Sequence, residues 1–75
     1  MTLDQLEPGQ TATIKRLNHD TPARLTRLLE MGLIEETEIE MIRRAPMGDP
    51  IEYRLGDYCL SLRTADAKLV EVEQQ

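Results

Sequence analysis

The stretch from Arg44 to Pro50 lies between two runs of alternating apolar and polar residues and constrains the fold more than any other segment. Before it, Ile39 and Met41 alternate with charged residues, and after it Tyr53 and Leu55 do the same. This alternation has the period of a strand that buries one face and exposes the other. The sequence therefore predicts two strands joined by this loop.

The loop combines two prolines with a glycine–aspartate pair. Pro46 and Pro50 fix their own φ and lack an N–H, while Gly48 and Asp49 supply turn chemistry between them. At roughly seven residues, the loop is longer than the 2–5 residues typical of hairpins, and it carries Met47. Two interpretations are open: the loop is a contact surface, or its prolines only protect a sheet edge.

Length and charge limit the possible functions. The chain has 75 residues and a formal net charge of −5, from nine Lys and Arg against fourteen Asp and Glu. Residues 1–75 therefore form a single small domain, which buries only about 60% of the surface that its unfolded chain exposes. The negative charge repels nucleic-acid backbones and anionic lipids, so we expect no nucleic acid as partner. Arginines can still form a local positive patch beside the acidic run from Glu35 to Glu40.

The number of cysteines and the N-terminal sequence indicate the cellular compartment in which the protein is expected. Cys59 is the only cysteine, so neither an intrachain disulfide nor a cysteine-based zinc site can form within one chain. The N-terminus lacks the features of a signal peptide, and no run of eighteen apolar residues occurs. We expect a cytoplasmic protein without membrane insertion.

Three further strands are predicted from the same alternation. They span Thr11 to Leu17, then 58–62 after a tight Gly56–Asp57 corner, with the even positions buried, and finally Leu69 to Val72. Five half-apolar strands cannot bury their apolar faces in a flat sheet of this size, whereas a curled sheet can. We therefore expect a mainly β fold, a small SH3-like barrel of about five strands with one α-helix.

Helix boundaries are indicated by capping residues. Pro22 suits the first helical position, with Asp20 or Thr21 as its cap, and Gly32 suits a left-handed stop at the other end. A single further helical turn is expected to begin with Thr64 as its cap. The chain therefore contains one helix of about three turns and one short turn of helix.

The predicted helix has two kinds of side chain on its surface. Leu25, Leu28 and Leu29 recur at the spacing of one helical face, which is expected to be buried. Arg24 and Arg27 lie away from this leucine stripe, where a solvated face is the expectation.

Catalytic and metal-binding patterns are sparse. His19, the only histidine, could pair with Asp20 as an oriented base, but a capping or exposed position at a strand end explains it better. Cys59 has no neighbour in sequence that would activate its thiol. These residues and Asp49 show no ligand spacing, and no phosphate-binding loop occurs. We expect no enzyme activity, no cofactor and no built metal site.

Four segments spread over nearly the whole chain carry a family resemblance: Leu6 to Gln10, Arg27 to Leu33, Ala45 to Ile51 and Leu60 to Arg63. On these segments, the sequence resembles FeoA, the small cytoplasmic partner of the ferrous iron transporter FeoB. The resemblance implies an SH3-like barrel without catalysis that docks on the cytoplasmic GTP-binding part of the transporter and supports iron uptake. Glu36 departs from the family, which commonly has glycine in this turn, and a positive φ there would be strained.

The leading hypothesis is a non-enzymatic accessory protein that binds the transporter through loop and helix-end contacts. Two segments form the expected partner-binding surface, the helix end (Met31, Gly32 and Leu33) and the arch (Ala45, Pro46, Met47, Gly48, Asp49 and Pro50). For Met31 and Leu33, packing against the second strand is the competing interpretation. Two alternative functions stay open: a regulatory module like that of iron-dependent repressors, and an iron sensor that binds ferrous ion through surface carboxylates.

Overall fold

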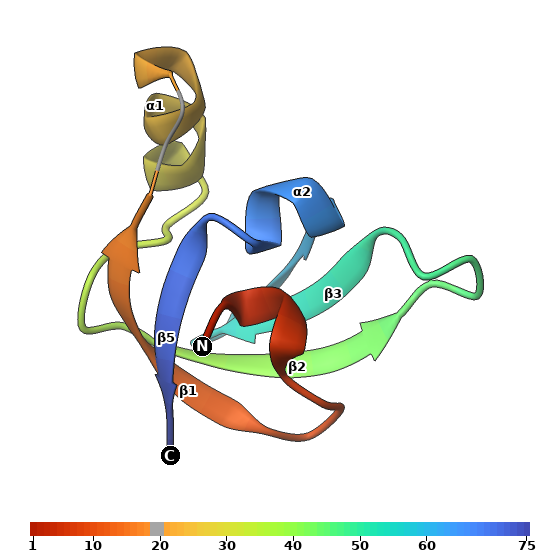
Figure 1. Cartoon of the computed structure of the whole chain (residues 1–75). Helices are drawn as coiled ribbons and strands as arrows, with labels where there is room; N and C mark the ends of the chain where they lie inside the picture. Colours follow the sequence, from red (N-terminus) through yellow and green to blue (C-terminus); the bar gives the residue numbers. More distant parts are fainter. Residues whose placement is uncertain (19–20) are drawn as a thin grey trace.

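The computed structural model describes residues 1–18 and 21–75, and Figure 1 shows the order of their helices and strands. The elements are η1 (Leu3–Gln5), β1 (Thr11–Leu17), α1 (Pro22–Glu30), β2 (Glu38–Arg44), β3 (Ile51–Leu55), β4 (Tyr58–Leu62), α2 (Thr64–Ala67) and β5 (Val70–Gln74). His19 and Asp20 lie outside the described residues, and so do the predicted His19–Asp20 pair and the Asp20 cap. The loop from 44 to 50 joins two strands, as the sequence predicts.

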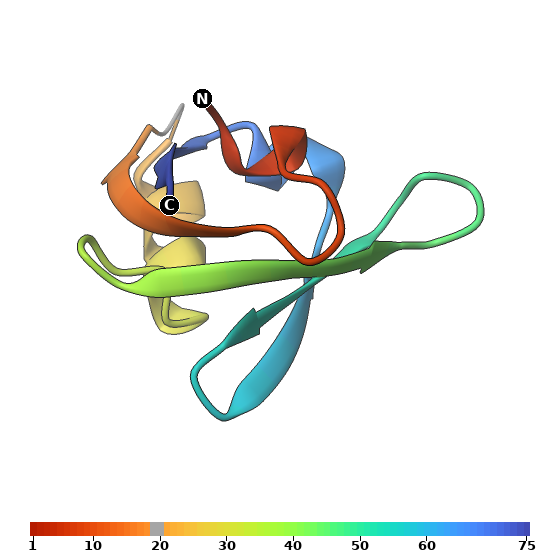
Figure 2. The same cartoon turned by 90° about the horizontal axis from the view of Figure 1, so that it is seen from below.

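All five strands pair in one antiparallel sheet with the order β4-β3-β2-β1-β5. The mainly β prediction is therefore confirmed. The pairing shifts register between Ile14 and Arg16 on β1 and between Met41 and Arg43 on β2. Such irregularities bend a sheet, and Figure 2 shows this one curling around its interior. Curling allows η1 to cover the interior, where it contacts both α2 and β5.

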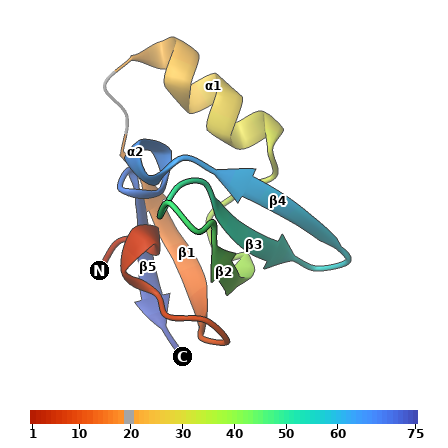
Figure 3. The ribbon, with the colours of Figure 1, turned by 90° about the vertical axis from the view of Figure 1, so that its right-hand side faces the viewer.

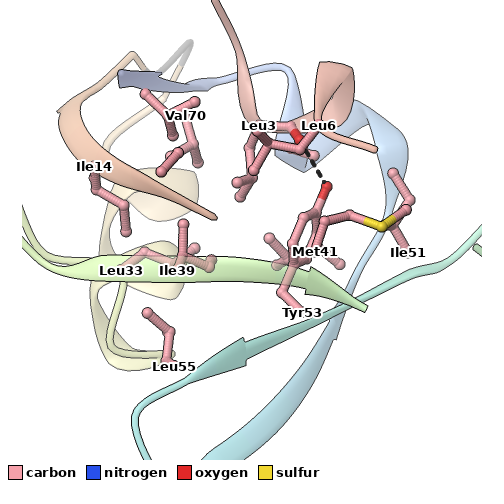
Figure 4. Packing of buried hydrophobic residues seen from close by; sticks show 14 of the residues in the cluster. Leu3, Leu6, Ile14, Leu33, Ile39, Met41, Ile51, Tyr53, Leu55 and Val70 are labelled. Atoms are coloured by element: carbon pink, nitrogen blue, oxygen red, sulfur yellow. Dashed lines mark hydrogen bonds between the residues drawn. The ribbon is translucent and has the colours of Figure 1, made fainter. Parts of the chain in front are cut away.

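The interior is built from aliphatic side chains and one tyrosine. Ala12 and Ile14 are buried, as the alternation on β1 predicts, and Leu3 of η1 joins them. The hydroxyl of Tyr53 donates a hydrogen bond to the carbonyl of Leu3, 3.1 Å away, in the middle of this cluster (Figure 4). Burial raises the pKa of the Tyr53 phenol above its usual range, although the positive charge of Arg44 opposes the effect.

Helix α1 has the two capping structures that its sequence predicts. The hydroxyl oxygen of Thr21 accepts a hydrogen bond from the backbone N–H three residues on, 3.2 Å away, and Pro22 follows it. At the other end, Gly32 has a φ of +91°, and the N–H of Leu33 reaches back to the carbonyl of Leu28 at 3.3 Å. This is the bond pattern of a Schellman motif, and both leucines of the pair are buried beneath it.

Two predictions about burial were wrong in part. Leu28 is buried, but Leu25 is only half-buried and Leu29 is 46% exposed. In Figure 3, α1 projects beyond the sheet, so only the central leucine of the stripe reaches the core. On β4, Leu62 is buried as predicted, whereas Tyr58 at the hairpin corner is 49% exposed.

The solvated face predicted for the arginines of α1 is confirmed only in part, because Arg27 is exposed and Arg24 half-buried but both contact a carboxylate. Arg27 is paired with Asp66 of α2, their atoms 2.8 Å apart, and Arg24 lies 3.6 Å from the same carboxylate. Asp66 is only 5% exposed. The arginine side of α1 therefore attaches the helix to α2, an arrangement that depends on a residue far along the chain.

The turn between α1 and β2 adopts a left-handed conformation at Glu36, whose φ is +70°. The strain expected of a side chain at a positive φ is therefore present here. Two interactions hold the residue: its N–H donates to the carbonyl of Ile14 at 2.7 Å, and its carboxylate lies 3.3 Å from the ammonium of Lys15.

Candidate protein-docking site

The arch is a braced loop that presents one apolar side chain. Pro46 and Met47 occupy the middle of a turn closed by a 2.7 Å hydrogen bond from the N–H of Gly48 to the carbonyl of Ala45. The N–H of Ala45 in turn donates to the carbonyl of Pro50 at 2.9 Å, which closes the base of the loop. Met47 is 93% exposed. Figure 1 shows the loop extending well beyond the sheet at the end of β2.

Asp49 ties the arch to the body of the protein. Its Oδ1 accepts hydrogen bonds from the backbone N–H of Thr64 at 2.7 Å and from the Thr64 hydroxyl at 3.1 Å. The prediction that Thr64 caps its own helical turn was therefore wrong, because Arg63 is the cap residue and the side chain of Asp49 supplies the bond. Asp49 thus positions the arch against α2.

A groove runs along the base of the arch. It encloses about 490 Å³. Its lining residues are Arg43, Arg44, Ala45, Pro46, Pro50, Glu52 and Ser61. Arg43 is largely exposed, although its Nε lies 2.9 Å from a carboxylate oxygen of Glu52, and Arg44 donates to the carbonyl of Asp4. The arch therefore combines an apolar tip with arginines at its base.

The helix end does not share this surface. Leu33 is buried in the core, which is the packing interpretation, and Met31 is half-buried against the core. The hydroxyl of Tyr58 donates to the carbonyl of Met31 at 2.7 Å and lies over Gly32. Figure 1 places the helix end and the arch toward opposite ends of β2, so the two predicted segments do not come together.

A second groove, which the sequence reasoning missed, lies between α1 and the end of β1. It encloses about 390 Å³ and is lined by Leu17, Leu25, Leu29, Ile34 and Glu35. Ile34 is 55% exposed. Two sequence features could have indicated this groove. The short helix carries more leucines than it can bury against the core, and an isoleucine follows it directly before two acidic residues.

The FeoA domain model matches residues 1–74. This chain belongs to the FeoA domain family. A relative in Campylobacter jejuni, 35% identical over 72 residues and covering 96% of each chain, is described as a putative Fe(2+) transport protein A. Another relative is the Fe(2+) transport protein A/Fe(2+) transporter FeoB fusion protein of Porphyromonas gingivalis, 41% identical over 73 residues. That match covers 97% of this FeoA chain but only 8% of the fusion protein.

Two solved FeoA structures resemble the chain closely. The solution structure of iron(II) transport protein A from Clostridium thermocellum has a TM-score of 0.90 and 40% identity, covering 99% of this chain and 45% of the other. The zinc complex of Stenotrophomonas maltophilia FeoA, described as a prokaryotic SH3 domain protein, has a TM-score of 0.85 and 30% identity. It covers 100% of this chain and 95% of the other. The SH3-like fold is therefore confirmed.

A manganese-dependent transcriptional repressor in complex with manganese shares the fold alone. Its TM-score is 0.91 at 17% identity, covering 100% of this FeoA chain and 36% of the repressor.

Among residues 1–18 and 21–75, no three histidine, cysteine, aspartate or glutamate side chains converge to hold a metal ion. In the same part of the chain, no helix has the length and apolarity that crossing a membrane demands. Cys59 is exposed on β4.

Proposed function

We propose that this FeoA chain binds the cytoplasmic GTP-binding part of an FeoB-type transporter through the arch, and thereby supports ferrous iron uptake. The observation that carries the proposal is Met47, an almost fully exposed apolar side chain at the tip of a loop closed by backbone hydrogen bonds. A loop that is already braced loses little backbone conformational entropy on binding, so more of the free energy gained by burying Met47 appears as affinity.

The anchoring of the arch supports the same function. Asp49 fixes the loop to α2, so its tip is held away from the sheet rather than folded onto it. Arginines at the base can contact carboxylates around an apolar pocket of the partner. The fusion protein of P. gingivalis, which carries transport protein A and FeoB in one chain, supports an association between the two when they are separate. In this proposal, the chain acts in the cytoplasm.

A substitution at the tip tests the proposal. Burial of a methionine side chain contributes about 1.5–3 kcal/mol, so Met47→Asp is expected to weaken binding at least about tenfold. The measurement is a pull-down and titration against the soluble GTP-binding domain of the transporter, with and without GTP. Ile34→Asp is the matched control because it changes an exposed apolar residue at the other end of β2.

The two variants separate the possible outcomes. Loss of binding by Met47→Asp alone supports the arch as the interface. If folded Met47→Asp binds as tightly as the wild type, the arch does not contact the partner and the proposal is wrong.

A second candidate function is direct binding of ferrous ion, which the zinc complex of the S. maltophilia relative favours. In this chain, the exposed carboxylates of Glu35, Glu36 and Glu38 are the surface groups that this function would use, and they do not converge on one point in the part of the chain that the structure describes. Anaerobic titration of ferrous ion into the protein tests this function. Stoichiometric micromolar binding supports it, and its loss in Glu35→Gln/Glu38→Gln would assign these carboxylates.

A further inference from the structure

The groove beside α1 has an apolar floor, and part of that floor is formed by α1 itself. Leu28 is the only buried side chain of α1, and Leu25 and Leu29 turn toward the groove instead. Leu17 from β1 and Ile34 from the following turn complete the floor. Two of these side chains are about half exposed, so the floor is open to a partner.

The surroundings of this groove are acidic. Glu35 lines it, Glu30 ends α1, and Glu36 and Glu38 follow in the turn that leads into β2. All four glutamates are exposed. Lys15 is the nearby basic residue, and its ammonium is 3.3 Å from Glu36. The acidic run identified in the sequence therefore collects at this end of the molecule.

The arginines near the groove form ion pairs with carboxylates that do not line it. Arg24 and Arg27 share the carboxylate of Asp66, at 3.6 and 2.8 Å, on the side of α1 that faces α2. Arg16, next to Leu17, is paired with Glu71 at 2.8 Å. Glu35 is therefore the charged residue that lines the groove, and a ligand of the groove meets its carboxylate first.

An apolar floor with an acidic rim is complementary to a basic amphipathic helix, whose leucines can enter the groove while its lysines face the glutamates. Membrane proteins carry an excess of Lys and Arg in the cytoplasmic segments that flank their spans. An anionic lipid surface, in contrast, would be repelled by the same rim.

We propose that this groove binds a Lys/Arg-rich amphipathic segment that flanks a membrane span of the transporter on its cytoplasmic side. The proposal rests on the proposed function, since it assigns a second contact with the same partner. Because α1, which lines the groove, and the arch lie toward opposite ends of β2 (Figure 1), one transporter can occupy both surfaces.

The probe for this proposal is a labelled model peptide of about five helical turns, with leucines at i, i+3, i+4 and i+7 and lysines elsewhere. Fluorescence anisotropy at low salt is expected to show binding that weakens at least about tenfold near 0.5 M salt, where charges more than a few ångströms apart are screened. Amide chemical shifts are expected to change at Leu25, Leu29 and Ile34 but not at Met47.

Two variants and a charge-matched control identify the surface. Ile34→Asp and Glu35→Lys are each expected to weaken peptide binding about tenfold or more. Glu7→Lys makes the same change in net charge in the exposed turn before β1, and it is expected to leave binding unchanged. Far-UV circular dichroism checks that each variant is folded.

Four outcomes would overturn the proposal. They are no binding of the basic peptide, equal binding of a peptide with glutamates in place of lysines, shifts that map elsewhere, and a wild-type dimer that Ile34→Asp dissociates. The last outcome would assign the groove to a second copy of the chain. The groove proposal and the arch proposal can fail separately. Met47→Asp is expected to leave binding of the peptide unchanged, and Ile34→Asp is expected to leave binding of the soluble GTP-binding domain unchanged.

Discussion

Arg27 on α1 donates hydrogen bonds from one guanidinium nitrogen to both carboxylate oxygens of Asp66 on α2, at 2.9 and 2.8 Å. The carboxylate is nearly buried, whereas the arginine is half exposed. Because α1 buries only Leu28 among its own side chains, this pair is a principal link between the helix and the rest of the fold.

Replacement of Asp66 by asparagine is expected to destabilise the protein by about 1–2 kcal/mol, because charged hydrogen bonds are lost at a nearly buried site. Urea unfolding followed by circular dichroism measures this change. Glu73→Gln, which removes an exposed carboxylate from β5, is the control and should be neutral. A loss of stability below about 0.5 kcal/mol for Asp66→Asn would show that the pair contributes no more than a surface ion pair.

Glycine at position 36 is expected to stabilise the chain by about 0.5–1 kcal/mol. The left-handed conformation costs a side chain about 1–2 kcal/mol, and glycine removes that cost while making the unfolded chain more flexible. The exposed Lys15–Glu36 pair is worth little. Thermal unfolding of Glu36→Gly should therefore show a higher midpoint. Glu35→Gly relieves no such strain and should be less stable than the wild type, and stabilisation by both variants would contradict this account.

Replacement of Gly32 by alanine is expected to produce a steric clash with Tyr58. A Cβ at Gly32 would lie 2.2 Å from the tyrosine hydroxyl oxygen, and the φ of +91° would be strained as well. Gly32→Ala should therefore cost about 2–3 kcal/mol. Tyr58→Phe removes the oxygen, so the cost of Gly32→Ala should fall by about 1 kcal/mol in that background. A double-mutant cycle by urea unfolding measures the coupling, and additive effects would show that the side chains avoid each other.

Stability should depend on the ionisation of Tyr53 at alkaline pH. Its pKa is raised by burial, so the unfolded chain loses this proton first, near its usual value of about 10. The contribution of Tyr53 is fully present below that pH and is lost as the pH rises toward the raised folded value. Tyr53→Phe loses the hydrogen bond to Leu3, at a cost of about 1 kcal/mol near neutrality. Its unfolding free energy should fall less steeply than that of the wild type above pH 10, and parallel curves would contradict the assignment.

The sequence predicted those features that local chemistry determines. Strand β1 has the bounds that the alternation indicates, Thr21 and Pro22 begin α1, and Gly32 ends it. Each of these depends on a few consecutive residues. The strained conformation of Glu36 also follows from its place in a turn where the resemblance indicates glycine.

The features that the sequence did not predict join residues far apart in the chain. Asp66 meets Arg27 across 39 positions, and Asp49 caps the turn that begins at Thr64, 15 positions later. No periodicity indicates which carboxylate will reach which donor. The groove beside α1 was missed for a related reason: the exposure of Leu29 depends on how far α1 projects from the sheet.

Strand β2 connects the acidic turn to the arch, and its seven residues, which bend at the register shift after Met41, extend over at most roughly 23 Å at 3.3 Å per residue. If the groove and the arch both bind as proposed, a spacer of this length makes the protein bivalent toward a partner with two suitably separated epitopes. Attachment at one end holds the other at a local concentration in the millimolar range. Two individually weak contacts can then produce lasting occupancy, while each still releases quickly when the partner changes shape.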